Sequence, residues 1–304
     1  MRVHHLNCIS SCPAGGRLMD HGPEGVLTRG RLTCHCLLVE TEFGLVLCDT
    51  GFGLRDVADP KRRLSSFFLA LVSPDFREEL TAARQVERLG FRTLDVRHIV
   101  LTHLDFDHAG GLDDFPNAKV HLLALERRSA IAQKTWLDRQ RFRPQQWSTQ
   151  PNWHIYPEAG GEPWFGFERA RPLVGLPPEI ALVPLIGHTD GHAGIAVDRG
   201  DRWVFLAGDA YFYHGEMHPS RPWCTPGLSF YQWMMDKQRD RRIHNQERLR
   251  ELKANHPREI QVFCSHDTDE FERLAGRTPE MPIPPRFSGA PRFPEAPPEA
   301  SPPP

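Results

Sequence analysis

Four potential metal ligands lie close together in the segment Leu101–Leu112. They are His103, Asp105, Asp107 and His108. The apolar run 96–101 precedes them and two glycines follow, which predicts a buried strand that ends in a loop and then turns into a helix. Carboxylates and imidazoles crowded into one cavity stay unsatisfied unless a cation lies among them. The segment therefore predicts a site for one or two metal ions, and a solvated acidic loop with incidental histidines is the other interpretation.

Further aspartates and histidines follow apolar runs elsewhere in the chain. They are Asp49 after 45–48, His188 after 180–185, Asp209 after 202–206 and His266 after 260–264. In layered α/β proteins, loops from separate strands meet beyond one sheet edge and build ligand sites there. We therefore expect these side chains to meet the ligands of the first segment. Asp49 is placed to hold a ligand histidine through its second ring nitrogen.

Hydrophobic patterns predict the elements that must position these loops. The expected strands are 32–40, 45–49, 96–101, 119–123, 180–185, 194–197, 202–206 and 260–264, and the expected helices are 75–90, 124–134 and about 228–255. Residues 139–178 carry several aromatic side chains among prolines and glycines, which predicts a long irregular loop. That loop lines a pocket for an apolar part of a substrate, or its aromatic side chains only anchor it.

Composition narrows the classes of function. The chain has 304 residues, a formal net charge of -2 and 39% apolar residues, so it can bury a sizeable core and has no general attraction for nucleic acid. It contains no apolar run of about 18 residues, and Met1–Asn7 does not resemble a signal peptide, so we expect a cytoplasmic protein without membrane segments. Its seven cysteines are expected to be reduced packing residues, since their spacing does not suit a common zinc module.

A change in composition near Gly276 predicts the domain boundary. Residues 1–276 carry all the candidate ligands, whereas residues 277–304 are rich in proline. We expect one hydrolase domain over 1–276 and a disordered tail over 277–304.

The ordered motifs resemble those of the metallo-β-lactamase superfamily. They are Asp49-Thr50-Gly51, then His103-Leu104-Asp105-Phe106-Asp107-His108, then Gly187-His188-Thr189-Asp190-Gly191-His192, then Gly208-Asp209, then Ser265-His266-Asp267. The closing motif and the spacing are more similar to the N-acyl homoserine lactonase branch than to the glyoxalase II branch. The resemblance implies an α/β fold, a four-layered αβ/βα sandwich of two mixed sheets flanked by helices. It also implies a site for two divalent ions at one edge.

Carried over by position, the resemblance assigns the ligands to two ions. His103 and His188 hold the first ion, Asp107, His108 and His266 hold the second, and Asp209 bridges them. The family usually has histidine where this chain has Asp105, which either donates an oxygen to the first ion or stays outside the ligand set. Zinc is the expected metal, and because a carboxylate is harder than an imidazole, manganese and iron are competitors.

Three more residues are weaker candidates. His192 either assists substrate binding or is a satisfied structural histidine. Tyr211 and Tyr213 lie near the point where the lactonases have a tyrosine that contacts substrate, but Phe212 occupies the expected spacing. These candidates and Asp49 complete the expected site.

The expected chemistry is hydrolysis. Two cations can share a hydroxide that attacks the carbonyl of an ester, lactone or thioester, with Asp107 and Asp209 as the catalytic carboxylates. A lactone or other carboxylic ester is the leading small-molecule substrate. A phosphodiesterase is the alternative enzyme, favoured by Asp105 and by Arg127, Arg128, Arg139 and Arg141. A non-catalytic metal-binding sensor is the third interpretation, and a homodimer is the expected assembly.

Overall fold

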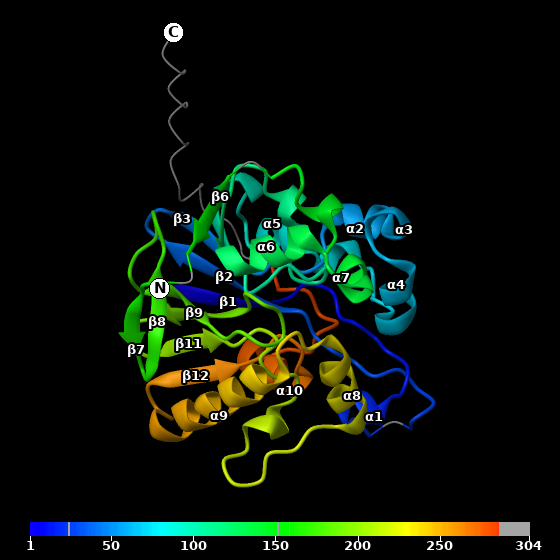
Figure 1. Ribbon diagram of the computed structural model, residues 1–304. Helices are drawn as coiled ribbons and strands as arrows, with labels where there is room; N and C mark the ends of the chain where they lie inside the picture. Colours follow the sequence, from blue (N-terminus) through cyan, green and yellow to red (C-terminus); the bar gives the residue numbers. More distant parts are fainter. Residues whose placement is uncertain (24, 151, 158, 286–304) are drawn as a thin grey trace.

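Two six-stranded sheets pack face to face between outer layers of helices (Figure 1). The computed structural model describes residues 1–285 except residues 24, 151 and 158. The strand order is β1-β2-β3-β4-β5-β6 in the first sheet and β12-β11-β10-β9-β8-β7 in the second. Both sheets contain parallel and antiparallel pairs. The structure confirms the predicted four-layered αβ/βα sandwich.

The strands of the first sheet are β1 (Arg2–Asn7), β2 (His35–Thr41), β3 (Gly44–Cys48), β4 (Val96–Val100), β5 (Lys119–Leu123) and β6 (Trp153–Tyr156). Those of the second are β7 (Glu162–Trp164), β8 (Phe167–Pro172), β9 (Ile180–Pro184), β10 (Ala193–Asp198), β11 (Trp203–Leu206) and β12 (Ile260–Phe263). Strands β3 to β6 run parallel to one another, as do β11 and β12. Within each parallel set, the loops that follow the strands therefore leave at one edge of the sheet.

The α-helices are α1 (Arg17–Asp20), α2 (Leu54–Ala58), α3 (Pro60–Arg63), α4 (Ser66–Val72), α5 (Ala82–Arg88), α6 (Ala124–Ala132), α7 (Trp136–Arg141), α8 (Pro226–Met235), α9 (Arg239–Asn255) and α10 (Thr268–Ala275). Short 3₁₀ turns lie at η1 (Glu78–Leu80), η2 (Thr93–Asp95), η3 (Leu112–Asp114), η4 (Pro144–Gln146) and η5 (His214–Met217). In Figure 1, α5 and α6 lie on the outer side of the first sheet and α9 on the outer side of the second. Among the described residues, we find no helix that combines the length and the apolar character needed to cross a bilayer.

Alternating side chains fill the layers between these elements. Leu37 and Val39 of β2 face the second sheet, where they join Ile195 of β10 and Leu206 of β11 in the central core. The intervening Leu38 packs in the opposite core, under α5. Because strand side chains alternate between faces, each inner strand contributes to two cores at once. This packing fixes the strand ends from which the functional loops leave.

The bounds predicted for two helices are wrong. The helix expected over 75–90 begins only at Ala82, because the Thr81 hydroxyl caps it by accepting a hydrogen bond from the amide of Arg84. Asp75, expected near its start, instead pairs with Arg77. The helix expected over 228–255 is two helices, α8 and α9. It breaks at residues 236–238, where the amides of Lys237 and Gln238 donate to the carbonyl of Gly187.

The prediction of an irregular loop over 139–178 is also wrong. Its residues form β6, β7 and β8 at the ends of the two sheets. Its aromatic side chains pack into the cores beneath: Trp147 and Trp153 into that of the first sheet, and Trp164, Phe165 and Phe167 into that of the second. The strand pattern was hidden because prolines and glycines interrupt these short edge strands. These aromatic residues anchor the segment.

The predicted tail begins with residues that pack on the domain. Ile283 is buried in the core of the first sheet, and its carbonyl accepts a hydrogen bond from Arg88 of α5. The side chain of Asn7 donates to the carbonyl of Pro279. Residues 277–285 therefore pack on the domain, contrary to a tail disordered from residue 277. Residues 286–304 of the predicted tail lie outside the described part of the chain.

Truncating the central core should destabilise the fold. Leu206 is fully buried between the sheets, so we expect Leu206→Ala to lower the free energy of unfolding by about 2–5 kcal/mol. The matched control is Leu27→Ala, since Leu27 is 99% exposed, and its effect should stay within about 0.5 kcal/mol. Denaturant unfolding measures both values. Equal stability of the two variants would contradict the assignment of Leu206 to the core.

Candidate metal centre

The loops that follow four strands bring the seven predicted ligands to one edge of the sandwich, where Asp49 joins them after a fifth strand. Asp49 follows β3, His103 to His108 follow β4, His188 follows β9, Asp209 follows β11 and His266 follows β12. All seven candidate ligands are at most 7% exposed, with Asp107 the most accessible. The structure thus gathers residues that lie up to 163 positions apart in the sequence into one buried cluster.

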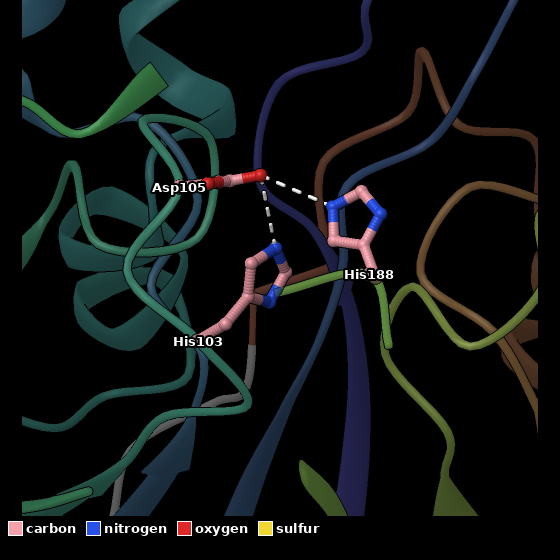
Figure 2. A group of neighbouring side chains, drawn as sticks. All are labelled: His103, Asp105 and His188. Carbon is pink, nitrogen blue, oxygen red and sulfur yellow. Dashed lines mark hydrogen bonds and ion pairs between the residues drawn. The ribbon is translucent and has the colours of Figure 1, made fainter. Parts of the chain in front are cut away.

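The first group of donor atoms comprises His103, Asp105 and His188. The Asp105 Oδ2 atom lies 3.3 Å from His103 Nε2 and 3.1 Å from His188 Nε2, and Figure 2 shows both rings directed at this carboxylate. Asp209 Oδ2 approaches the same two nitrogens, at 3.7 Å and 3.3 Å respectively. These four atoms form the first subsite.

The second group comprises Asp107, His108 and His266. Asp209 Oδ1 lies 3.4 Å from His108 Nε2 and 3.2 Å from His266 Nε2. The Asp107 oxygens lie 3.9 Å and 3.8 Å from the same two nitrogens. These residues form the second subsite. Asp209 contacts both subsites, as a bridging ligand must, and its Oδ2 atom also lies 3.2 Å from His266 Nε2.

The two subsites fit divalent ions. Donor atoms 2.0–2.1 Å from a tetrahedral zinc ion lie about 3.3 Å from one another, and the donor contacts above span 3.1–3.9 Å. Among the described residues, His103 Nε2, His108 Nε2 and Asp209 Oδ1 are buried without a hydrogen-bond partner. Buried polar atoms of this kind indicate a ligand, since leaving them unsatisfied is costly.

Hydrogen bonds to Nδ1 orient three of the histidines. Asp49 Oδ2 accepts from His108 Nδ1 at 2.8 Å and from the Thr102 hydroxyl at 2.7 Å. That hydroxyl, having donated its proton, accepts from His103 Nδ1 at 2.9 Å, and the carbonyl of Thr33 accepts from His266 Nδ1 at 2.7 Å. Each Nε2 lone pair therefore faces the centre, as ligand histidines require.

Asp49 is held in an unusual backbone conformation to do this. Its φ is 54°, in the left-handed region that few residues other than glycine adopt. Its Oδ1 atom also accepts from the amide of Thr102 at 2.7 Å. The structure therefore places Asp49 behind His108, as the sequence predicted. Strain of this kind persists where surrounding bonds fix it, and it is typical of functional sites.

Glu126 of α6 is a supporting residue that sequence reasoning missed. Its carboxylate accepts from the amide of Leu104 at 2.9 Å, from the Thr189 hydroxyl at 2.6 Å and from the amide of Gly191 at 3.0 Å. It thereby joins the loop after β4 to the loop after β9. Burial raises the pKa of Glu126 to about 7. No local motif predicts this role, because Glu126 lies in a helix whose other charged residues are basic and typical of a solvent-exposed face.

His192 is a structural histidine. Its Nδ1 donates to the carbonyl of Leu185 at 3.0 Å, so its Nε2 accepts from the amide of Asp209 at 2.9 Å. Burial lowers the pKa of His192 to about 3, which keeps the ring neutral for this role. Gly208 must be a glycine here: its φ is 57°, and a Cβ would lie 2.6 Å from His192 Nε2. His192 thus positions Asp209 through its backbone, the second of the two roles considered for it.

The structure does not bring the two predicted tyrosines to the centre. The hydroxyl of Tyr211 donates to Glu270 of α10, and Tyr213 packs against Trp223 with ring centroids 4.7 Å apart. Phe212, between them, stacks on His266 at 4.9 Å. Because consecutive side chains diverge, the ring nearest the ligands is the phenylalanine.

Tyr231 of α8 is the tyrosine near the centre. Its ring lies 5.7 Å from that of Phe212. Burial, followed by the charges of Asp107, Asp105 and Asp209, raises the pKa of its hydroxyl well above the ordinary value. No sequence motif pointed to Tyr231, because it lies in a helix far from every motif.

Arg141, at the end of α7, is the cation of the first subsite. Its Nε donates to Asp105 Oδ1 at 2.7 Å and its Nη2 to Asp105 Oδ2 at 2.5 Å, and the side chain is fully buried. Burial would raise the pKa of Asp105, but the Arg141 guanidinium and the nearby imidazole of His103 hold it well below the usual range. Asp105 is therefore a carboxylate that is already paired. The sequence singled out Arg141 only as one of several basic residues.

The remaining carboxylates of the centre differ in their acidity. Burial opposes ionisation of Asp209, yet His266, His108 and His188 hold its pKa well below the usual range. Burial raises the pKa of Asp107, although His108 and His266 oppose this effect. The pKa of Asp209 is therefore shifted down and that of Asp107 is shifted up.

A four-layered αβ/βα sandwich with a buried cluster of aspartates and histidines at one edge defines a class of metal-dependent hydrolases. The sequence model of the metallo-beta-lactamase superfamily matches residues 29–266. The chain therefore belongs to the metallo-β-lactamase superfamily, as its motifs predicted. Members of this family typically bind divalent metal ions.

Relatives are similar over different lengths. A probable metallo-hydrolase of Mycobacterium tuberculosis is 42% identical over 272 residues, which cover 90% of this chain and 82% of that protein. An N-acyl homoserine lactonase of Bacillus thuringiensis is 31% identical over 129 residues, which cover 41% of this chain and 52% of that protein.

Solved structures show the same fold. One is an N-acyl homoserine lactone hydrolase with the product N-hexanoyl-L-homoserine bound at its catalytic metal centre. It aligns with a TM-score of 0.66 at 20% identity, over 89% of this chain and 95% of that chain. A dizinc quorum-quenching lactonase aligns with a TM-score of 0.57 at 17% identity, over 87% of this chain and 86% of that chain. At these identities the likeness concerns the fold alone.

Removing the charge of Asp49 should weaken metal binding. In Asp49→Asn, the amide group cannot serve both Thr102 and His108 as acceptor, so His108 loses its orientation. We expect the affinity for zinc to fall by about 10–100-fold, measured by competition with a chromophoric chelator. The control is Asp198→Asn at the end of β10, where the carboxylate contacts only the nearby turn through Gly200. Unchanged affinity in Asp49→Asn would contradict the supporting role.

Proposed function

We propose that this protein is a metal-dependent hydrolase that cleaves carboxylic ester-type bonds, with lactones as the leading substrates. The observation that carries the proposal is the pair of four-donor subsites joined by Asp209. Its metal ligands are His103, Asp105, Asp107, His108, His188, Asp209 and His266. We propose zinc as the metal, with manganese or iron as the competitors that the aspartate-rich donor set admits.

Bound divalent ions would supply hydroxide at neutral pH and polarise the scissile carbonyl. Asp107 and Asp209 are the proposed catalytic carboxylates. Asp209 stays ionised and fixes the distance between the two subsites. Asp107 is the most exposed of the ligands, so it is suited to orient water and to carry a proton to the leaving oxygen.

Apolar side chains beside the centre support a substrate with an apolar part. Phe106, between two ligands, packs on Phe68 of α4 with ring centroids 4.5 Å apart, and Met235 and Tyr231 of α8 join the same cluster. Nearby on α7, Trp136 is 53% exposed. Phe106, Phe68 and Met235 are at most 2% exposed, so an acyl chain would meet only the accessible side chains beside them, Tyr231 and Trp136. The three similar proteins described above are a lactonase, a lactone hydrolase and a further lactonase by their names, and the hydrolase binds a product with an N-hexanoyl chain.

The phosphodiesterase interpretation is less well supported. It relied on Asp105 and on the basic residues of α6 and α7, and the structure pairs Asp105 with Arg141. Arg127 lies over the Trp153 ring at 5.6 Å, and Arg139 donates to the carbonyl of Gln133. These contacts direct the three cations to groups of the protein itself and not to a substrate phosphate.

The sensor interpretation is disfavoured by the complete set of metal donors. The homodimer and the cytoplasmic location stay predictions from the sequence.

Substrate class is tested with the metal-loaded protein and a panel of lactones, aryl esters, thioesters and bis-aryl phosphodiesters. We expect lactones to have the highest kcat/KM. His108→Ala and Asp209→Ala should each abolish turnover and reduce bound metal, because each removes a donor from the centre. Preferred hydrolysis of phosphodiesters would overturn the proposed substrate class. A metal-loaded protein inert toward the whole panel would favour the sensor.

Metal removal should also lower stability. Without cations, the buried carboxylates of the centre repel one another, and a ligand present at 100 times its Kd stabilises a fold by about 2.7 kcal/mol. We therefore expect chelator-treated protein to melt at a lower temperature than protein with excess zinc, and zinc to restore the higher value. Differential scanning calorimetry measures both. Identical melting temperatures would contradict a metal centre that forms part of the native fold.

A further inference from the structure

The contacts of the Arg141 guanidinium extend beyond Asp105. Its Nη1 atom donates a 2.6 Å hydrogen bond to the carbonyl of Met235, the last residue of α8, and this bond holds the guanidinium group in place. Its Nη2, already bonded to Asp105 Oδ2, lies 2.8 Å from His188 Nε2. The guanidinium therefore bonds to two of the four donor atoms that make up the first subsite.

The chemistry of arginine sets the direction of this contact. An arginine side chain stays protonated in proteins and has only N–H donors, so a hydrogen bond from Nη2 at 2.8 Å requires His188 Nε2 to accept with its lone pair. The same Nε2 atom lies 3.1 Å from Asp105 Oδ2, a contact in which it would have to donate, and the shorter contact with Arg141 favours the accepting form. The Nδ1 atom of His188 is buried without a hydrogen-bond partner among the described residues. His188 thus differs from His103, His108 and His266, whose Nδ1 atoms are all held by neighbouring oxygens.

An imidazole nitrogen has a single lone pair. His188 Nε2 can share it with an N–H of Arg141 or with a metal ion, but not with both. A divalent ion at the first subsite would also meet the positive charge of the guanidinium at close range. The donors of the second subsite, by contrast, include the His108 and His266 nitrogens, whose rings are already oriented toward it.

We propose that Arg141 and a divalent ion compete for the first subsite. While the guanidinium binds Asp105 and His188, the centre holds one firmly bound ion, at Asp107, His108, Asp209 and His266. A second ion binds only when the Arg141 N–H releases His188 Nε2. The inference rests on the proposed metal centre and is independent of the substrate.

The test is metal stoichiometry. Chelator-treated wild-type protein is equilibrated with buffered zinc and its metal content is measured by mass spectrometry, with calorimetric titration for the affinities. We expect one zinc per chain to bind at least 10-fold more tightly than the second. In Arg141→Met, two ions should bind with similar affinity, because the competing N–H is absent.

A second variant guards against misfolding, since Arg141→Met leaves the buried Asp105 without its cation. In Asp105→His/Arg141→Met, the carboxylate and the guanidinium are removed together, and we again expect two ions per chain. The matched control is Arg63→Met. Arg63 is also a buried arginine paired with aspartates, Asp56 and Asp113, and these are not candidate ligands. It should keep the wild-type pattern.

The outcomes separate the two proposals. Two equally tight zinc ions in the wild-type protein, or a single tight ion in the double variant, would overturn the competition. Wild-type protein that binds no zinc would overturn the metal centre as well. Wild-type protein with one tight ion that hydrolyses no lactone would support the competition and refute only the proposed substrate.

Discussion

Burial of carboxylates at one edge of the sandwich is the constraint on which the rest of the structure depends. Asp105, Asp107 and Asp209 are each at most 7% exposed, and their oxygens face imidazole nitrogens across the centre. Removing ionised groups from water is costly unless opposite charge lies beside them. One such charge is the Arg141 guanidinium, and the unpartnered donor atoms indicate that the others are cations bound from solution.

The centre keeps its geometry because a second set of residues fixes the loops that carry it. Asp49 orients His108 and, through Thr102, His103, while His192 holds the backbone of Asp209. Glu126 joins the loops after β4 and β9. None of these interactions needs the metal to form. The loops are therefore pre-organised, which lowers the free-energy cost of assembling the ligands around an ion.

The substitution that sets this chain apart is compensated within the fold. An aspartate at position 105, where the family usually has histidine, adds a negative charge to the first subsite, and Arg141 returns a positive one. The pair is neutral as a unit, but its guanidinium also reaches His188. The two subsites therefore differ in charge, and only the first has donor atoms that are hydrogen-bonded to an arginine, although both subsites belong to one cluster.

The motifs of the sequence predicted the family and the residues that meet at the edge, and the layered fold followed from the resemblance to that family. The strands and the ligands are encoded locally, since apolar runs mark the strands and the ligands follow them directly. The sequence could not predict the partners of those residues. Arg141 lies 36 positions from Asp105 and Tyr231 lies in a distant helix, and neither belongs to a motif. The same limit applies to β6, β7 and β8, whose short runs carry little periodicity. Which side chains touch was decided by tertiary packing, because contacts between distant segments depend on how the sheets and helices stack and leave no regular spacing in the chain.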